Sequence, residues 1–141
     1  MIKVEQLDLF DLISERHNKV RRLLEEKWNE SSDITISNSE WFILAKISGG
    51  THPTIASLAK EVQISRQATH KFIKKLETKG IVEMFYKHNN RDKFIQLTEL
   101  GEMCVNKYLL LKKEVEEGIS ERVGKEQLTQ LKNLLKSDWG L

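Results

Sequence analysis

The most regular alternation of apolar and polar positions lies between residues 54 and 79. Its first part repeats apolar residues at i, i+3, i+4 and i+7, which is typical of one buried helix face. Gln63 and Ile64 interrupt the pattern. Ser65 can then cap a second helix, because its hydroxyl can accept a hydrogen bond from a free amide of the first turn. Gly80 is placed to end that helix in a left-handed conformation. The expected buried residues are Ile55, Leu58, Ala59 and Val62 in the first helix and Ala68 or Thr69, Phe72, Ile73 and Leu76 in the second, with Ile64 leading into it.

The opposite face of the second helix is polar and basic, and Glu77 is its first acid. A short helix, a tight turn and a basic second helix form the helix-turn-helix arrangement, which places its second helix in the DNA major groove. We therefore expect a helix-turn-helix over 54–79. Its exposed residues are Arg66, Gln67, His70, Lys71, Lys74 and Lys75.

After Gly80 the period changes from helical to alternating. Residues 81–87 and 93–98 are rich in β-branched and aromatic side chains, which favours two strands, and residues 88–92 between them are polar and turn-forming. This predicts a hairpin wing over 81–98, directly behind the basic helix. Such a loop can reach the adjacent minor groove, where negative potential is concentrated.

Upstream, Ser37 and Glu40 fit a capping box that opens a helix over 41–47. This helix is apolar on most sides, so we expect it in the core. Pro53 favours extended backbone before it and can add a short edge strand. Together these elements predict a winged helix-turn-helix lobe over 37–98.

Long amphipathic segments flank this lobe. Residues 2–29 predict one helix, Thr98 can cap another, and residues 125–137 predict a last one, with Gly118 as a possible bend. The small lobe cannot bury all of these stripes, so we expect residues 1–36 and 99–141 to form a helical dimerisation region within a single domain, 1–141. The fold class is mainly α with a small β-hairpin. The stripes are Leu9, Ile13, Val20, Leu24 and Trp28, then Leu100, Cys104, Tyr108, Leu111, Val115 and Ile119.

The charge distribution supports this division. The formal net charge of the 141 residues is +2, yet residues 51–97 hold nine Lys or Arg against four Asp or Glu. The net charge of residues 51–97 is thus +5, and the net charge of the remaining residues is −3. Charge alone favours a solvated helix face over a nucleic-acid surface, and the two-helix pattern at the same place reverses that preference.

Other function classes lack their motifs. There is no apolar run long enough to span a membrane and no secretory signal, so we expect a cytoplasmic protein without membrane contacts. Nucleophile elbows, phosphate-binding Gly loops and HExxH are absent, so we expect neither an enzyme nor a cofactor. The four histidines and one cysteine show no metal-ligand spacing. The alternative function is a winged helix used for protein contacts, which the polar second helix disfavours.

The chain resembles the MarR family of bacterial transcriptional regulators over nearly its whole length. The most specific segments are ISRQATHKFIKKLETKGIVE and RDKFIQLTELG, with Leu-Thr-x-x-Gly at 97–101. The resemblance implies a homodimer that binds a pseudo-palindromic double-stranded DNA operator, and for many members repression that a small ligand releases. The family's wing commonly carries Asp-x-Arg, whereas this chain has Asn89-Asn90-Arg91, without the charge pairing.

Each candidate DNA-binding residue also has a plainer interpretation. Arg66 and Gln67 can read guanine and adenine edges, or are simply two exposed residues of the first turn. His70 either reads a base or contacts a phosphate, and Ala68 either touches a thymine methyl or packs. Thr54 and Ser65 can bind phosphate, although capping is their expected main role. Lys71 and Lys74 suit phosphates. The remaining candidates lie in the wing and are Asn90, Arg91 and Lys93.

A ligand pocket is expected between the long helices and the lobe. Its candidates are His17, Trp28, Trp41 and Tyr108, and core packing is the alternative for the aromatic ones. Cys104 does not match the position of the oxidant-sensing cysteine in related regulators, so we expect it to pack as a small apolar residue.

Overall fold

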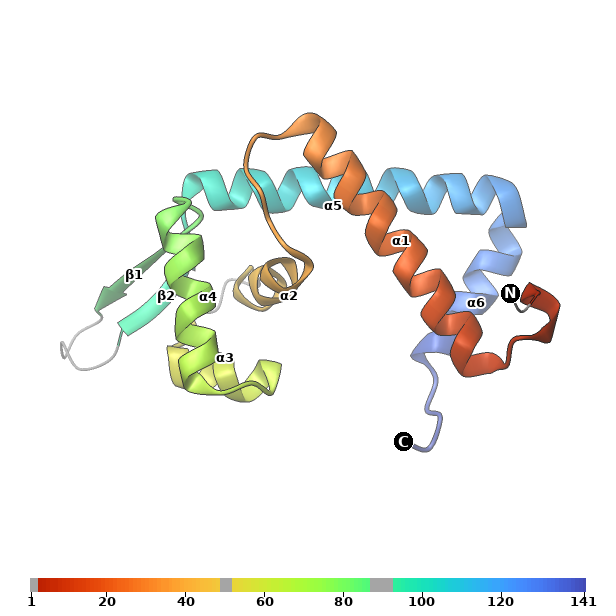
Figure 1. The fold of residues 1–141 in the computed structure, drawn as a ribbon, viewed down its shortest axis with the longest axis horizontal. Coiled ribbons are helices and arrows are strands. Elements are labelled where there is room, and N and C mark those ends of the chain that lie inside the picture. Colours follow the sequence, from red (N-terminus) through yellow and green to blue (C-terminus); the bar gives the residue numbers. More distant parts are fainter. Residues whose placement is uncertain (1–2, 49–51, 87–92) are drawn as a thin grey trace.

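The computed structural model describes residues 3–48, 52–86 and 93–141, and its elements follow the expected order. In Figure 1 the long helix α5 extends horizontally across most of the molecule, and α1 crosses it. The helices and the hairpin of the middle segment lie below α5, towards the end where α5 begins. The expected fold class, mainly α with a two-stranded hairpin, is confirmed. The elements are α1 (Leu9–Ser31), α2 (Asn38–Ile47), α3 (Ile55–Val62), α4 (Arg66–Thr78), β1 (Val82–Tyr86), β2 (Lys93–Leu97), α5 (Glu99–Val123) and α6 (Lys125–Lys136).

The first helix begins later than we predicted. Residues 4–6 form a short 3-10 turn, Leu7 is extended, and α1 starts at Leu9. The cause is Asp8, whose Oδ1 accepts the amide of Asp11 at 2.9 Å, because Asp is among the best residues at an N-cap. The helix also continues past the predicted end to Ser31.

The predicted caps in the middle segment are confirmed. Ser37 and Glu40 form the reciprocal capping box of α2, and Ser65 Oγ accepts the amide of Ala68 at 3.0 Å at the start of α4. Thr54 caps α3 in the same way by accepting the amide of Ser57 at 3.1 Å. Gly80 has φ +78°, the left-handed conformation that ends α4. The segment 54–80 is therefore specified largely by local hydrogen bonds.

The two predicted strands form an antiparallel hairpin within one residue of the expected bounds, and the residues between them lie outside the described ranges. In place of the expected edge strand, Thr54 forms an isolated bridge with Phe94, and the Ile95 amide donates to the Pro53 carbonyl at 2.8 Å. The hairpin thus lies against the start of α3.

The Leu-Thr-x-x-Gly segment at 97–101 joins the hairpin to α5. Thr98 caps α5 by accepting the amide of Gly101 at 3.0 Å, and its hydroxyl donates back to the Gly80 carbonyl. A Cβ on Gly101 would lie 2.0 Å from the Ile81 carbonyl oxygen, so this approach requires glycine. Gly118 lies within α5, which continues unbroken to Val123.

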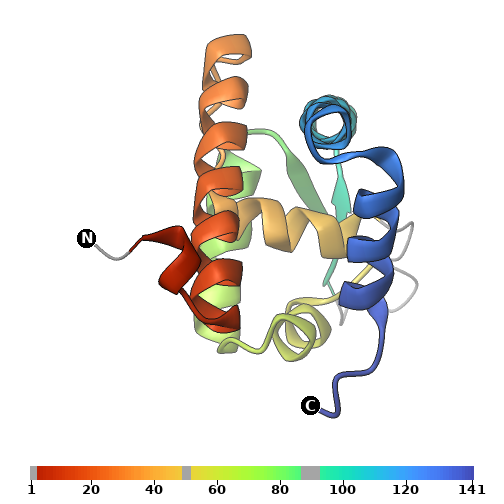
Figure 2. The ribbon, with the colours of Figure 1, turned by 90° about the vertical axis from the view of Figure 1, so that its right-hand side faces the viewer.

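Burial is concentrated in the middle segment. Leu44, Leu58, Ile73, Leu76 and Ile95 are each 0% exposed. Figure 2, which looks along α5, shows α2 beside α1 and below α5, with α3 at the bottom. By contrast, none of the residues of α6 is buried. No helix in the described part of the chain has the length and apolarity to cross a membrane.

Candidate nucleic-acid interface and ligand cavity

Helix α4 has one buried face and one exposed basic face. Thr69, Ile73 and Leu76 point into the core, and the Thr69 hydroxyl donates to the Ser65 carbonyl at 2.9 Å. The opposite face begins directly after the Ser65 cap, where the helix presents free amides and a partial positive charge. The predicted residues Arg66, Gln67, His70, Lys71, Lys74 and Lys75 are all exposed, whereas Ala68 is half-buried.

A three-residue turn joins α3 to α4. Gln63 adopts φ +60° and ψ +40°, a left-handed conformation uncommon for a residue other than glycine, and the Ile64 amide bonds the Ala59 carbonyl at 3.2 Å. This geometry sets the angle between the two helices. Ile64, which we expected to lead into the buried face, is 38% exposed.

A groove of about 370 Å³ lies between α3, α4 and the hairpin. It brings together Thr54, His70, Lys74 and Lys93, four of the predicted DNA-binding residues from three elements. Tyr86 also lines it and was not among our candidates. Tyr86 faces Lys93 across the hairpin, with the Lys93 ammonium 5.5 Å from the ring centroid. Its position opposite a wing lysine on the neighbouring strand is the sequence feature that could have identified it.

Most cations of this face have no acid beside them among the described contacts. Lys74 is the exception, because its ammonium lies 3.3 Å from Glu77. Both side chains are exposed, so this pair contributes little to stability and leaves Lys74 available for an anionic partner. The predicted wing residues Asn90 and Arg91 lie outside the described residues.

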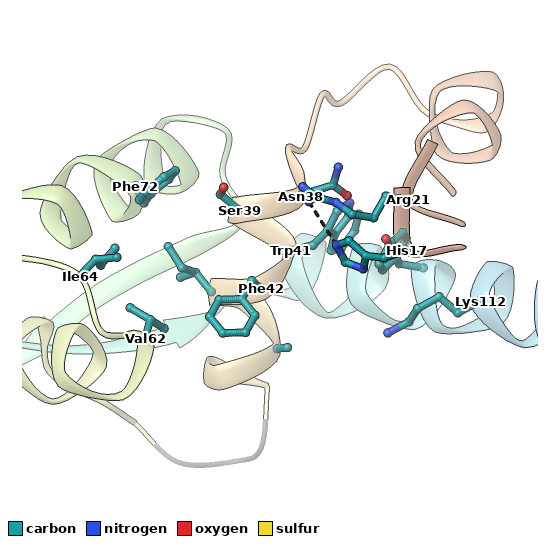
Figure 3. Close-up of a pocket in the computed structure, with 13 residues that line it drawn as sticks. His17, Arg21, Asn38, Ser39, Trp41, Phe42, Val62, Ile64, Phe72 and Lys112 are labelled. Carbon is teal, nitrogen blue, oxygen red and sulfur yellow. Dashed lines mark hydrogen bonds between the residues drawn. The ribbon is translucent and has the colours of Figure 1, made fainter. Parts of the chain in front are cut away.

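A second hollow, a cavity of about 570 Å³, lies between the long helices and the middle segment. His17, Trp41 and Tyr108 line it, three of the four residues we predicted there. Figure 3 shows His17, Arg21 and Lys112 on one side, with Phe42, Val62, Ile64 and Phe72 on the other. None of the lining residues that the structure describes is acidic.

The aromatic wall of the cavity is a stack. The rings of Trp41 and Tyr108 are nearly parallel, 4° apart in plane and 3.9 Å between centroids. Trp28, the fourth predicted residue, does not line the cavity, because it lies behind Trp41 with 1% exposure and meets its ring edge-on at 4.9 Å. Burial raises the pKa of the Tyr108 hydroxyl, which the charge of Arg21 partly opposes.

The cations of the cavity were missed from sequence, although helical spacing gave a signal. Arg21 follows His17 by four residues, and its Nη1 lies 3.4 Å from His17 Nε2. Lys112 follows Tyr108 by four residues, with its ammonium 5.2 Å from the ring centroid. Residues at i and i+4 share a helix face, so each known candidate pointed to its cationic neighbour.

Cys104 packs in the core, as expected, with 5% exposure. Burial raises the pKa of its thiol, although nearby Lys107 acts in the opposite direction. A thiol with a raised pKa forms less of the reactive thiolate at neutral pH, which agrees with a packing role.

Comparison with known proteins finds a family match in the middle of the chain. The model of the MarR family matches residues 36–91, which contain α2, α3, α4 and the hairpin. Over these residues the chain is similar to MarR family transcription regulators. No curated protein sequence matches it.

Solved structures of MarR proteins share the fold. MarR from E. coli is 22% identical, with 92% of this chain and 96% of that chain covered and a TM-score of 0.72. FabT from Streptococcus pneumoniae, solved in complex with DNA, is 20% identical, with 90% of each chain covered and a TM-score of 0.78. MepR from Staphylococcus aureus is 19% identical, with 92% and 94% covered and a TM-score of 0.74. These matches extend the MarR fold beyond residues 36–91 to the long terminal helices.

Proposed function

We propose that this chain is a MarR family regulator, a homodimeric, sequence-specific DNA-binding repressor that a small ligand releases from its operator. The observation that carries the proposal is the exposed face of α4. Its first turn presents Arg66 and Gln67 beside a groove that gathers Thr54, His70, Lys74 and Lys93. Two related structures, FabT and MepR, were solved with DNA.

The proposed contacts divide by chemistry. Arg66 and Gln67 read base edges in the major groove, since both side chains can make two hydrogen bonds to one purine. His70 follows one turn later, and Ala68 beside it contacts a thymine methyl. Thr54, Ser65, Lys71, Lys74 and Lys93 bind phosphates, which fix position and carry affinity. In the wing, Asn90 and Arg91 enter the minor groove, where an arginine meets concentrated negative potential.

A second copy of the chain completes the proposed regulator. Along α6 the apolar residues Leu131, Leu134 and Leu135 are 49%, 62% and 55% exposed, and Phe10 at the start of α1 is 74% exposed. Apolar stripes of this kind are stable when another helix covers them. The termini, 1–36 and 99–141, therefore form the proposed dimerisation region, and 37–98 the DNA-reading lobe. A regulator of this kind works where the chromosome lies, so the expected cytoplasmic location belongs to the same proposal.

The cavity is the proposed ligand site. Its walls combine the Trp41–Tyr108 stack with the positive charges of Arg21 and Lys112. Such a pocket favours an organic anion with an apolar body, because the rings bury its surface and the cations hold its charged group. Binding there places the ligand between the terminal helices α1 and α5 on one side and the lobe, through α2, α4 and the turn before α4, on the other.

DNA binding is tested by fluorescence anisotropy on the chain's own promoter region across a salt series. We expect Arg66→Ala to weaken binding about tenfold or more, because a two-pronged base contact is lost. The matched control is Arg22→Ala, an exposed arginine of α1, which should bind as the wild type does. Equal affinity of the Arg66 variant and the wild type would contradict the assigned role.

The alternative, a winged helix used for protein contacts, has a different signature. A protein interface usually contains buried aromatic or apolar anchors, whereas the outer face of α4 is polar and cationic. A tight protein partner together with no DNA affinity at low salt would favour this alternative.

A further inference from the structure

The residue that caps the C-terminal end of α4, the proposed recognition helix, is bonded to a segment far away in the sequence. Lys79 directly follows α4, and its ammonium lies 2.9 Å from both carboxylate oxygens of Glu40 and 2.5 Å from the Thr35 carbonyl oxygen. An ammonium has three hydrogens to donate, and these three acceptors use all of them. We call this cluster of Lys79, Glu40 and the Thr35 carbonyl the Lys79 tether.

The ion pair of the tether is partly buried and supported by further hydrogen bonds, unlike an exposed surface ion pair. Glu40 is 4% exposed and also accepts the Ser37 amide at 2.9 Å. Burial acts to raise the pKa of this carboxyl, but the Ser37 amide and Lys79 outweigh it and hold the pKa below its ordinary value. The carboxylate is therefore stabilised in its charged form by the Ser37 amide, at the end of the 32–37 segment, and by Lys79, which follows α4.

The middle of that segment is held by α1. Trp28 donates its indole N–H to the Ile34 carbonyl at 2.7 Å, one residue before the carbonyl that Lys79 holds. Trp28 in turn meets Trp41 edge-on at 4.9 Å, and Trp41 is stacked on Tyr108 in the cavity wall. Every step from the cavity wall to the end of α4 is thus a direct contact or a neighbouring peptide.

We infer that Glu40 and Lys79 are positioning residues that couple the recognition helix to the ligand cavity through residues 32–37. A ligand that shifts the Trp41–Tyr108 stack moves Trp28 and the Ile34–Thr35 backbone with it. Lys79 transfers that movement to the C-terminal end of α4 and so changes how the helix fits the major groove. The role in regulation rests on the proposed function, whereas the mechanical link does not.

The link is tested by hydrogen exchange in Trp28→Phe. This change removes the indole N–H and keeps an aromatic ring in the core. We expect the amides of Lys79, Gly80 and Ile81 to exchange about two- to tenfold faster, the range expected when one hydrogen bond that supports them is lost. The chain offers a matched control in Trp139→Phe, because Trp139 donates the same kind of bond to the Leu134 carbonyl at 2.7 Å outside this route. The control should leave these three amides unchanged.

A reciprocal variant guards against a general loss of stability. Lys79→Met should speed exchange at residues 34–36, and Lys79→Arg should restore much of the protection, because it keeps the charge and the donors. The link would be overturned if Trp28→Phe left exchange at residues 79–81 unchanged and Lys79→Met left exchange at residues 34–36 unchanged. A uniform rise over α5 and the lobe alike would overturn it too, since that reports global destabilisation.

The proposed effect of the tether on DNA binding is tested by measuring DNA affinity in a double-mutant cycle of Trp28→Phe and Lys79→Met. Coupled residues give a double variant that binds at least threefold more tightly than the product of the two single effects, and independent residues give that product. A simple product would overturn the coupling. If the wild type binds no DNA at low salt, the proposed function fails, and the exchange experiment still decides the mechanical link.

Discussion

The middle lobe and the terminal helices arrange similar amphipathic patterns in opposite ways. In α4 the apolar residues Ile73 and Leu76 are 0% exposed, because the same chain covers them. In α6 the stripe is as regular, yet Leu134 is 62% exposed and no residue of the helix is buried. An apolar stripe therefore shows that a face needs cover, but not whether the cover comes from its own chain or from a second copy.

The largest expected effect comes from changing the exposed stripe of α6. The double variant Leu131→Asp, Leu134→Asp should no longer self-associate, so light scattering should give the mass of one chain, 16.5 kDa, instead of twice that value. Operator affinity should fall about 100-fold or more, because two joined half-site readers bind far more tightly than one. Lys60→Asp is the control for the mass, since Lys60 is an exposed residue of α3 in the lobe, outside the proposed dimerisation region. A dimeric mass for the double variant would contradict the proposal.

The next effect concerns the lobe core. Ile73→Ala removes a fully buried side chain and should lower the free energy of unfolding by about 2–5 kcal/mol in urea denaturation. Leu134→Ala makes the same kind of truncation on an exposed face. Its cost should appear only at concentrations where the dimer forms and should vanish on dilution. Similar losses for both variants at every concentration would remove the distinction between the two regions.

The lobe could be predicted closely because its signals are local. Ser37 with Glu40, Ser65 with Ala68, and Gly80 each fix a helix end within a few residues. The predicted start of α1 was wrong, although its signal is also local. The apolar pattern continues across Asp8, whereas the side-chain cap at Asp8 begins the helix. The outer face of α4 followed from periodicity alone.

The cavity and the tether could be predicted only in part. Lys79 and Glu40 are 39 positions apart, and no period connects them, so their ion pair depends on how α2 and α4 pack. Trp28 shares a stripe with Leu24, but its side chain lies behind Trp41 and not in the cavity. Long-range packing decides such details, whereas a sequence pattern reports only which face is apolar.

The tether also predicts how stability depends on pH. The folded pKa of Glu40 lies below its ordinary value of 4.5, so its contribution is present above about pH 4.5 and is lost as the pH falls through the folded pKa. Glu40→Gln should lower the unfolding free energy by about 1–3 kcal/mol at pH 7 and flatten this acid loss. The control is Glu15→Gln, whose partner Lys19 lies 3.6 Å away on an exposed face. It should keep the wild-type pH profile, and a profile equally steep in Glu40→Gln would argue against the tether.

The smallest effect compares one type of hydrogen bond in the two regions. Ser65 Oγ accepts an amide at 3.0 Å at the start of α4, and Asp8 Oδ1 accepts one at 2.9 Å at the start of α1. Ser65→Ala should cost about 1 kcal/mol of unfolding free energy, because the capped turn continues into the buried Thr69 and Ile73.

Asp8→Ala should cost less than about 0.5 kcal/mol in dilute protein, although the bond is equally short, because the first turn of α1 is exposed and can fray without uncovering the core. At dimer-forming concentrations its cost should rise toward that of Ser65→Ala, since the proposed partner covers the same turn. Urea denaturation at two protein concentrations separates these outcomes. A concentration-independent cost at Asp8 would mean that α1 gains nothing from a second chain.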